Sequence, residues 1–289
     1  MRTYDTLRLF VLKMRRNLFV LPPEGLIPTL RVNFAILRNK VFPRATKPAE
    51  IAPLAHPIDR QYGIDTSGYL GLQQLQSGKS SDVYNACYCG SQPSIVRKAL
   101  QVLPDHHNFS FLDLGCGKGR ALAVASEFPF RRIVGVELVP SVVSTARANA
   151  EVIRSRFPDR TPIEIVEGDA MTTAIPDGRV VIFFYHPFYR KIMKGVLRNI
   201  EKWLSRSKSK AFVVYCTPFY FDLYDKSRLF RRFYVGMMGY EAHERGTGFD
   251  DSDEAVAIWQ SVGEPMLEAH PQAMAKFQTE PLRNRVRLS

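Results

Sequence analysis

The chain has 289 residues, 45% of them hydrophobic and 24% charged, which suits one large α/β domain with an extension or two small domains. Its four cysteines, Cys87, Cys89, Cys116 and Cys216, form no CxxC pair, so we predict free thiols in a reducing compartment, the cytoplasm, and neither a disulfide scaffold nor a metal site. The net charge of +12 predicts either binding to an anionic partner or a basic surface that is simply exposed to solvent.

Residues 1–60 form a basic extension, with eleven Lys and Arg against four Asp and Glu, a net of +7. Apolar residues at helical spacing predict helices over 3–21 and 28–42, and a Pro- and Ala-rich stretch predicts a linker over 43–57. A basic arm of this kind can bind nucleic acid, phospholipid headgroups or an acidic protein. The alternative is that its charge only keeps the protein soluble.

Basic residues near the N-terminus bear on whether this region is a signal peptide or a membrane segment. They interrupt the first apolar stretch, which argues against a signal peptide, and no apolar run reaches the roughly 18 residues that a transmembrane segment needs. The two helices could pack on the main domain, which is the commoner fate, or lie on a membrane surface as a peripheral anchor.

Strands alternate with helices in the rest of the chain. Apolar runs predict strands over 110–114, 132–138, 163–166, 180–185, 211–216, 229–237 and 255–262. Helices are predicted over 95–103, 121–127, 141–156 and 189–204, the third of them with a serine cap. Continuous apolar strands separated by helices indicate a doubly wound, mostly parallel seven-stranded sheet, and a turn-rich segment predicts a C-terminal antiparallel hairpin. We place the main domain at 61–264 and a poorly packed tail at 265–289.

A glycine loop follows the first of these strands. Asp113 stands just before the loop, and Gly115, Gly117 and Gly119 lead into a helix. Glycines let the backbone turn tightly and let a ligand approach without a Cβ in the way, while loop amides can bind a carboxylate. In an open α/β sheet this position is where ligands bind. The spacing departs from the G-x-G-x-x-G/A dinucleotide fingerprint, because the sixth position is Arg120.

Two carboxylates end the next two strands. Glu137 can accept hydrogen bonds from both hydroxyls of an adenosine ribose, a demand common to NAD and S-adenosylmethionine (SAM). Asp169 can accept from the adenine amino group, while Ala170 supplies a backbone amide to the ring. A surface carboxylate at a strand end is the alternative for each.

The fourth strand ends in His186-Pro187-Phe188. A proline directly after an apolar central strand forces the chain to turn beside the ligand, and the aromatic ring can form a wall of the acceptor pocket. Upstream, Tyr84 or Tyr88 is predicted to contact the cofactor, with core packing as the alternative, and the polar turn over 65–68 is a candidate lid.

Together, DLGCGKGR, the strand-ending Glu137, EGDA and His-Pro-Phe resemble the motifs of class I, seven-stranded SAM-dependent methyltransferases over about residues 84–262. The resemblance implies a Rossmann-like fold with SAM as cofactor. It places Asp113, Gly115, Gly117 and Gly119, with Cys116 in the same loop, at the methionine end of SAM, Glu137 at the ribose and Asp169 with Ala170 at the adenine. The wording of the first motif also resembles a subgroup related to protein-lysine methyltransferases, which often has asparagine where this chain has His186.

The resemblance leaves the acceptor open. A protein amine, first a lysine, is the leading prediction; a small molecule, a lipid-linked group or RNA is the alternative. His186 could act as a base, bind the nucleophile or support the loop. Two other classes of function remain as alternatives. A nucleotide-dependent oxidoreductase predicts the G-x-G-x-x-G/A spacing, which this chain lacks. A non-catalytic binding protein that uses the basic arm predicts damaged SAM motifs, whereas here the motifs are intact.

Overall fold

The computed structural model describes residues 56–71, 74–78, 82, 87–206, 209–244, 253–263, 267–280 and 285–288. The helices predicted over 3–21 and 28–42 and most of the predicted linker lie outside this set, so a contact between the basic arm and an anionic surface stays a prediction. None of the helices within the described ranges is both long and apolar enough to cross a membrane.

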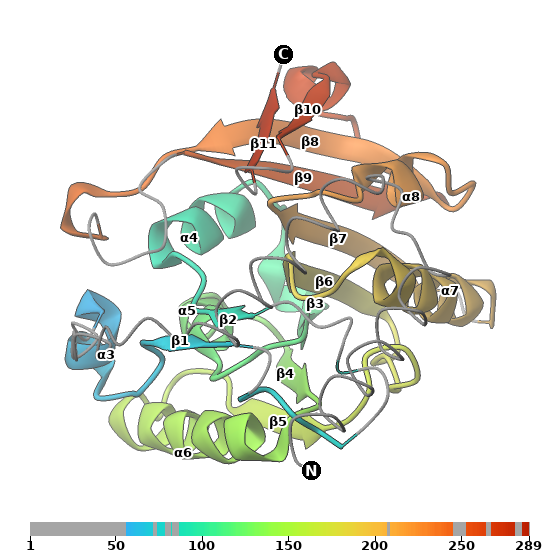
Figure 1. Ribbon diagram of the computed structural model, residues 1–289. Helices are drawn as coiled ribbons and strands as arrows, with labels where there is room; N and C mark the ends of the chain where they lie inside the picture. The colour runs from blue at the N-terminus through green and yellow to red at the C-terminus, as the bar shows by residue number, and fades with distance from the viewer. Residues whose placement is uncertain are drawn as a thin grey trace, which may run out of the picture. The chain divides into compact units, whose positions relative to one another are not determined.

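A sheet of seven strands forms the centre of the domain, in the order β5-β4-β3-β6-β7-β9-β8 (Figure 1). The strands are β3 (Phe109–Leu114), β4 (Arg132–Glu137), β5 (Ile163–Glu167), β6 (Arg179–Tyr185), β7 (Lys210–Cys216), β8 (Phe230–Met238) and β9 (Glu254–Ser261). Strands β3 to β7 pair in parallel, whereas β9 is antiparallel to both β7 and β8. This confirms the predicted doubly wound sheet with an antiparallel pair at its C-terminal end.

The order of the last two strands was not part of the prediction. The final strand of this sheet, β9, lies between β7 and β8, so that Tyr215 on β7 pairs with Ala257 and Arg231 on β8 pairs with Gln260. Strand β8 is therefore at the edge although it precedes β9 in the chain. Alternation of apolar residues predicts that a strand exists, but the choice of its neighbours depends on packing across the whole sheet.

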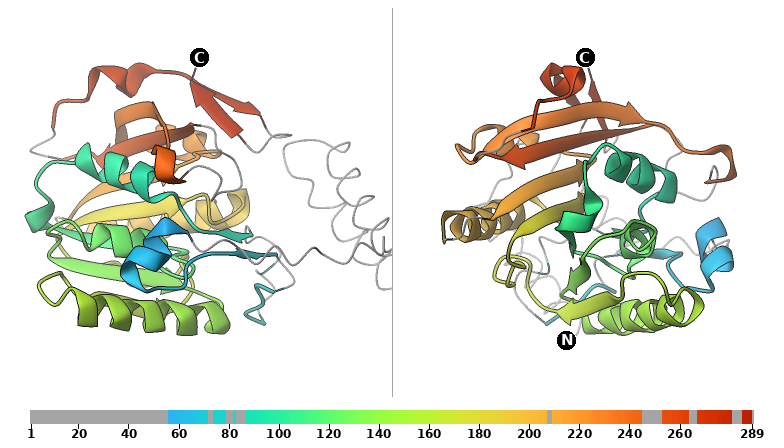
Figure 2. Two further views of the ribbon diagram at one scale, coloured as in Figure 1. Left: turned by 90° about the vertical axis from the view of Figure 1, so that its left-hand side faces the viewer. Right: turned by 180° about the vertical axis from the view of Figure 1, so that it is seen from behind.

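Helices cover both faces of the sheet, as Figures 1 and 2 show. On one face lie α3 (Pro57–Tyr62), α4 (Pro93–Gln101), α5 (Arg120–Ala125) and α6 (Pro140–Arg156), and on the other lie α7 (Arg190–Arg206) and α8 (Phe221–Asp225). Successive strand residues serve the two faces in turn: Phe111 joins the first core and Leu112 the second. Every residue of β3 is buried, as expected for a central parallel strand.

Helix α6 does not begin as predicted. It starts at Pro140, one residue before Ser141, and the N-cap Val139 makes no side-chain capping bond. The serine cap is therefore wrong. Proline suits the first helical position because its fixed φ matches the helix and its missing N–H would have no partner there.

The C-terminal residues are also better packed than the sequence suggests. The 3-10 helix η4 (Pro271–Met274) contributes the buried Ala273, and β10 (Phe277–Glu280) pairs with β11 (Arg285–Leu288). The ring of Phe277 lies 4.6 Å from that of Phe221 on α8, centroid to centroid. These residues therefore add a small hairpin to one core in place of the predicted loose tail.

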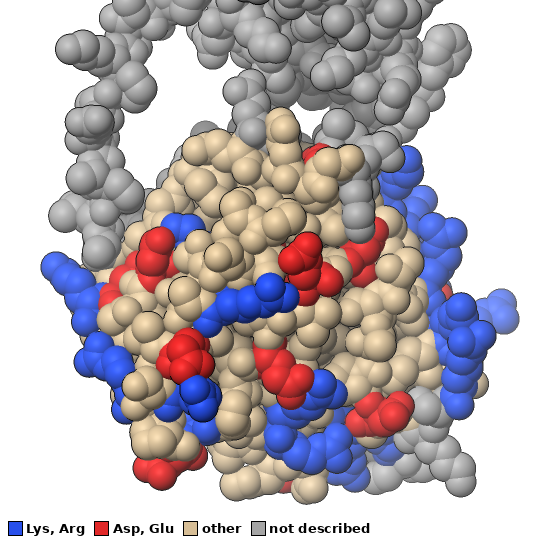
Figure 3. Space-filling view, turned by 90° about the horizontal axis from the view of Figure 1, so that it is seen from below, with Lys and Arg blue, Asp and Glu red and all other residues tan. Residues whose placement is uncertain are grey.

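Shorter elements complete the described part of the chain. Strands β1 (Tyr69–Leu70) and β2 (Tyr88–Cys89) pair with each other, and the 3-10 helices are η2 (His106–Asn108) and η3 (Ala242–Glu244). Acidic and basic side chains are interspersed on the face seen from below in Figure 3. Elsewhere among the described residues, ion pairs such as that between Arg132 on β4 and Glu164 on β5 join neighbouring strands. Within the described ranges, no group of three or more His, Cys, Asp or Glu is arranged to hold a metal ion.

Candidate functional site

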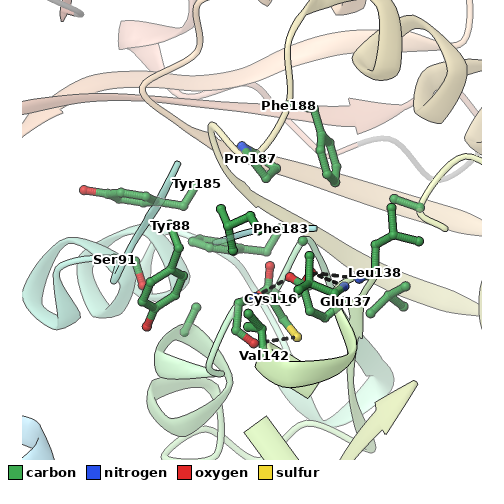
Figure 4. Close-up of a pocket in the computed structure, with 18 of the residues that line it drawn as sticks. Tyr88, Ser91, Cys116, Glu137, Leu138, Val142, Phe183, Tyr185, Pro187 and Phe188 are labelled. Atoms are coloured by element: carbon green, nitrogen blue, oxygen red, sulfur yellow. Dashed lines mark hydrogen bonds between the residues drawn. The ribbon is translucent and has the colours of Figure 1, made fainter. Parts of the chain in front are cut away.

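A pocket opens where the parallel strands end, and it collects most of the residues that the sequence singled out (Figure 4). The predicted residues that line it are Tyr88, Asp113, Gly115, Cys116, Gly117, Glu137, Asp169, Ala170, Pro187 and Phe188. Gly119 and His186 do not line it. Tyr84 lies outside the described residues.

The glycine loop is approached closely from two sides. Gly117 has φ +54° and lies under the ring of Tyr88, so that a Cβ there would be 2.4 Å from the ring carbon Cε2. Gly115 has φ +82°, and its Cβ would be 2.7 Å from Cβ of Pro187. Any side chain would be strained by the backbone angle and would also collide with these rings. Glycine is therefore required at both positions, which bring the β2 segment and the β6 end onto the loop.

Glu137 ties this loop to the end of β4. Its carboxylate accepts hydrogen bonds from the amides of Gly117 at 3.0 Å, Leu138 at 2.8 Å and Val139 at 2.9 Å. Burial raises the pKa of this carboxyl group, and the three amides offset part of that rise. The side chain is thus held in one orientation at the edge of the pocket, next to Leu138 in Figure 4.

Asp113 adds a second buried carboxyl group at the end of β3. It is 3% exposed and lines the pocket. Its pKa is raised well above the ordinary value, first by desolvation and then by the neighbouring charge of Glu137. A cationic ligand in the pocket would offset both causes, so the two acids favour a ligand that carries positive charge.

The end of β5 supplies the third carboxylate. Asp169 folds back so that one of its oxygens accepts the amide of Met171 at 2.8 Å, and the amide of Gly168 donates to the carbonyl of Glu137 at 2.9 Å. Ala170 is buried and lines the pocket beside it. These residues form a short, ordered turn at one end of the pocket.

Three aromatic side chains and a proline, from β6 and the turn after it, form the other end. Phe183, Tyr185, Pro187 and Phe188 all line the pocket (Figure 4). The hydroxyl of Tyr185 donates to the carboxylate of Glu254 on β9. Tyr185 and Glu254 were not identified from the sequence, although Tyr185 is the last residue of a recognised strand and its alternation with Phe183 gave a usable signal.

His186 turns away from this pocket. Its ring makes a 3.0 Å hydrogen bond with the hydroxyl of Tyr215 and lies against the rings of Phe219 and Tyr220, at centroid distances of 4.7 and 5.6 Å. Burial lowers the pKa of the ring to about 4. The geometry favours the loop-supporting role among the predicted ones, because a ring that does not line the pocket is poorly placed to receive a proton there.

Replacing His186 by asparagine is expected to leave SAM affinity within about twofold and to weaken the acid sensitivity of the fold. Its φ of +41° is one that asparagine tolerates. Since the folded pKa lies below the unfolded value of 6.5, the ring contributes a loss of stability as the pH falls from about 6.5 towards 4. The fall in Tm between about pH 7 and pH 4.5 should therefore be smaller in His186→Asn.

Thermal unfolding across this pH range tests the prediction. The exposed His107 offers the matched control, and His107→Asn should keep the wild-type dependence of Tm on pH. An unchanged dependence in His186→Asn, or a loss of SAM affinity beyond about tenfold, would show that the ring has a different role.

Arg120 is the pocket residue whose importance the sequence reasoning missed. It is 5% exposed, lines the pocket and begins α5 directly after Gly119. A signal was available: a cation in the first turn of a helix faces the positive end of the helix dipole, which is unfavourable without a compensating role. The guanidinium of Arg120 donates hydrogen bonds to the hydroxyl and to the carbonyl of Thr66, which lies in the turn predicted as a candidate lid.

SAM, the ligand that the resemblance implies, suits these residues. The glycine loop lines the pocket, and the carboxylates of Glu137 and Asp169 are acceptors that can receive the ribose hydroxyls and the adenine amino group. The buried acid of Asp113 favours the positively charged methionine end. The aromatic wall on β6 then borders the space left for an acceptor.

Comparison with known proteins agrees with this geometry. Residues 111–207 match the family model described as a methyltransferase domain. No curated protein matches the sequence of the chain.

Several solved structures share part of the fold. An RNA methyltransferase from Salinibacter ruber in complex with S-adenosyl-L-homocysteine is 19% identical with a TM-score of 0.37, covering 60% of this chain and 94% of that one. The phosphoethanolamine N-methyltransferase 1 of Haemonchus contortus is 14% identical with a TM-score of 0.43, covering 62% and 44%. A precorrin-6y C5,15-methyltransferase from Geobacter metallireducens is 16% identical with a TM-score of 0.41, covering 57% and 85%.

Proposed function

We propose that this chain, which is a class I SAM-dependent methyltransferase, transfers the methyl group of SAM to a protein amine, first of all a lysine side chain. The observation that carries the proposal is the continuity of the pocket, which runs from Glu137 and Asp169 to the aromatic wall on β6 and the turn after it. Behind that wall lies the carboxylate of Glu254, bound to the hydroxyl of Tyr185.

The acceptor end suits a long side chain that ends in a cation. The methylenes of a lysine can pack on Phe183, Pro187 and Phe188, while its ammonium is attracted to aromatic faces and to nearby carboxylates. Glu254 accepts hydrogen bonds from Tyr185, Tyr240 and, at 3.2 Å, Thr217, so its carboxylate is fixed close to the wall.

The main task of the protein in this reaction is to position the acceptor amine. When bound, SAM supplies a methyl group on a sulfonium, which is already a strong electrophile. The chain holds the amine nitrogen in line with that carbon and keeps water out, a contribution that can lower the barrier by several kcal/mol, up to about 10. The amine must lose its proton to solvent before it attacks, and burial favours the neutral form by desolvation, against the attraction of the ammonium to the carboxylates.

The proposal is tested by incubating the protein with SAM that carries a radiolabelled methyl group and an extract of its source cells. Parallel samples are treated with protease, with nuclease or by lipid extraction, and labelled protein is hydrolysed to amino acids. We expect protease-sensitive label that elutes as methylated lysine. Glu137→Ala serves as the inactive control, because it removes a residue that orders the loop.

Each other distribution of label identifies a different acceptor. Label in the nuclease-sensitive, lipid or small-molecule fraction contradicts the protein-amine proposal and replaces it with that acceptor class. Protein label on a residue other than lysine contradicts the lysine assignment and retains the protein acceptor.

A further inference from the structure

The pocket contains an unbalanced set of charges. Among the described residues that line it, three are carboxylates, Asp113, Glu137 and Asp169, and Arg120 is the one that always carries a positive charge. The described acids also leave Arg120 without an ion pair, since none has a carboxylate oxygen within 4.0 Å of its guanidinium. The guanidinium reaches a carboxylate indirectly, through the hydroxyl of Thr66, which donates to Asp59, and direct contact with an anion would stabilise such a buried cation further.

Neutral oxygens hold the guanidinium in place. Nε donates to the hydroxyl of Thr66 at 2.7 Å and Nη2 to its carbonyl at 2.9 Å, while the hydroxyl of Ser67 and the carbonyl of Ser91 lie at 3.4 and 3.5 Å. Nη1 has two hydrogens, and its only partner within the described residues is the distant Ser91 carbonyl. Donor capacity therefore remains on the pocket-lining side chain.

A second layer fixes these partners. The carboxylate of Asp59 accepts from the amide of Thr66 at 3.0 Å, from the hydroxyl of Thr66 and from the hydroxyl of Ser67 at 2.5 Å. The guanidinium also lies directly against Gly90, where a Cβ would be 2.4 Å from Cζ of Arg120. The cation is thus positioned before any ligand arrives, so little ordering cost is left for binding.

We infer that Arg120 binds the α-carboxylate of the methionine part of SAM. SAM has one anionic group, and the pocket wall has one fixed cation in its described part. Arg120 borders the loop and the β2 segment with Tyr88 and Ser91, whereas Glu137 and Asp169 occupy the ends of β4 and β5. This inference rests on SAM as the cofactor and does not depend on which acceptor is methylated.

Decarboxylated SAM gives a direct test, because it keeps the adenosine, the sulfonium and the amine and lacks only the carboxylate. In isothermal titration, we expect the wild type to bind it at least about tenfold more weakly than SAM. Arg120→Gln should weaken SAM binding by about 10- to 100-fold and change the affinity for decarboxylated SAM by less than about threefold. Arg120→Lys, which keeps the charge and loses the planar fork, should fall between these values.

Arg97 provides the control. It is paired with Glu127 at 2.6 Å and does not line the pocket, so Arg97→Gln should leave both affinities unchanged. Equal wild-type affinities for the two ligands, equal losses for both in Arg120→Gln, or no binding of SAM by the wild type would each overturn the inference. Circular dichroism monitors the folding of each variant. If Arg120→Gln is unfolded, the inference is tested by the ratio of the wild-type affinities for SAM and decarboxylated SAM and by the affinities of Arg120→Lys.

Discussion

Glu137→Ala is expected to lower the affinity for SAM by about 100-fold. The carboxylate is buried at the end of β4 and is held by the amides of Gly117, Leu138 and Val139. We expect this carboxylate to receive the ribose hydroxyls of SAM, and one charge-assisted hydrogen bond contributes about 1.5–3 kcal/mol. Alanine removes these acceptors and leaves the loop amides without a partner. Isothermal titration with SAM and S-adenosylhomocysteine measures the effect.

The neighbouring strand offers a matched control. Glu167 pairs in register with Glu137 at the end of β5, but it is exposed and does not line the pocket. Glu167→Ala should therefore bind SAM within about twofold of the wild type. A folded Glu137→Ala variant that keeps its affinity within about fivefold would mean that the ribose binds elsewhere.

Gly117→Ala is expected to reduce SAM affinity by a similar or larger factor and to destabilise the fold by about 2–4 kcal/mol. The added methyl group would lie 2.4 Å from Cε2 and 2.6 Å from Cδ2 of Tyr88. Tyr88 cannot move away freely, because its hydroxyl donates to the carbonyl of Thr66 at 2.6 Å. The ring, the loop or both must shift, and the pocket that they line then changes shape.

A second glycine separates backbone strain from this collision. Gly178 has φ +89°, yet the nearest atom to its Cβ would be the flexible end of Arg131, at 3.3 Å. Gly178→Ala should thus show only the strain of the backbone angle, about 1–2 kcal/mol by chemical denaturation, with unchanged SAM affinity. If both variants lost affinity alike, the effect would come from general destabilisation, and the contact with Tyr88 would have no special importance.

The residues of this site that could be predicted from the sequence are those marked by short local patterns, namely acids near strand ends and a loop of glycines. Asp113, Glu137 and Asp169 each stand near the carboxyl end of a predicted strand, and glycines mark the one loop where a ligand can approach the backbone. Because the carboxyl ends of parallel strands meet at one edge of a sheet, residues at those ends must gather there. The pocket confirms this for all three acids.

Only the tertiary structure decided how the rest of the chain meets this edge. Arg120 is held by Thr66, 54 residues earlier, and Tyr185 by Glu254, 69 residues later, and no periodicity links such positions. The turn of His186 away from the pocket follows from its φ of +41° and from packing on Phe219 and Tyr220. The insertion of β9 between β7 and β8 has the same origin. Local sequence determines which elements form and where their ends lie, whereas contacts between distant segments depend on how all the faces pack at once.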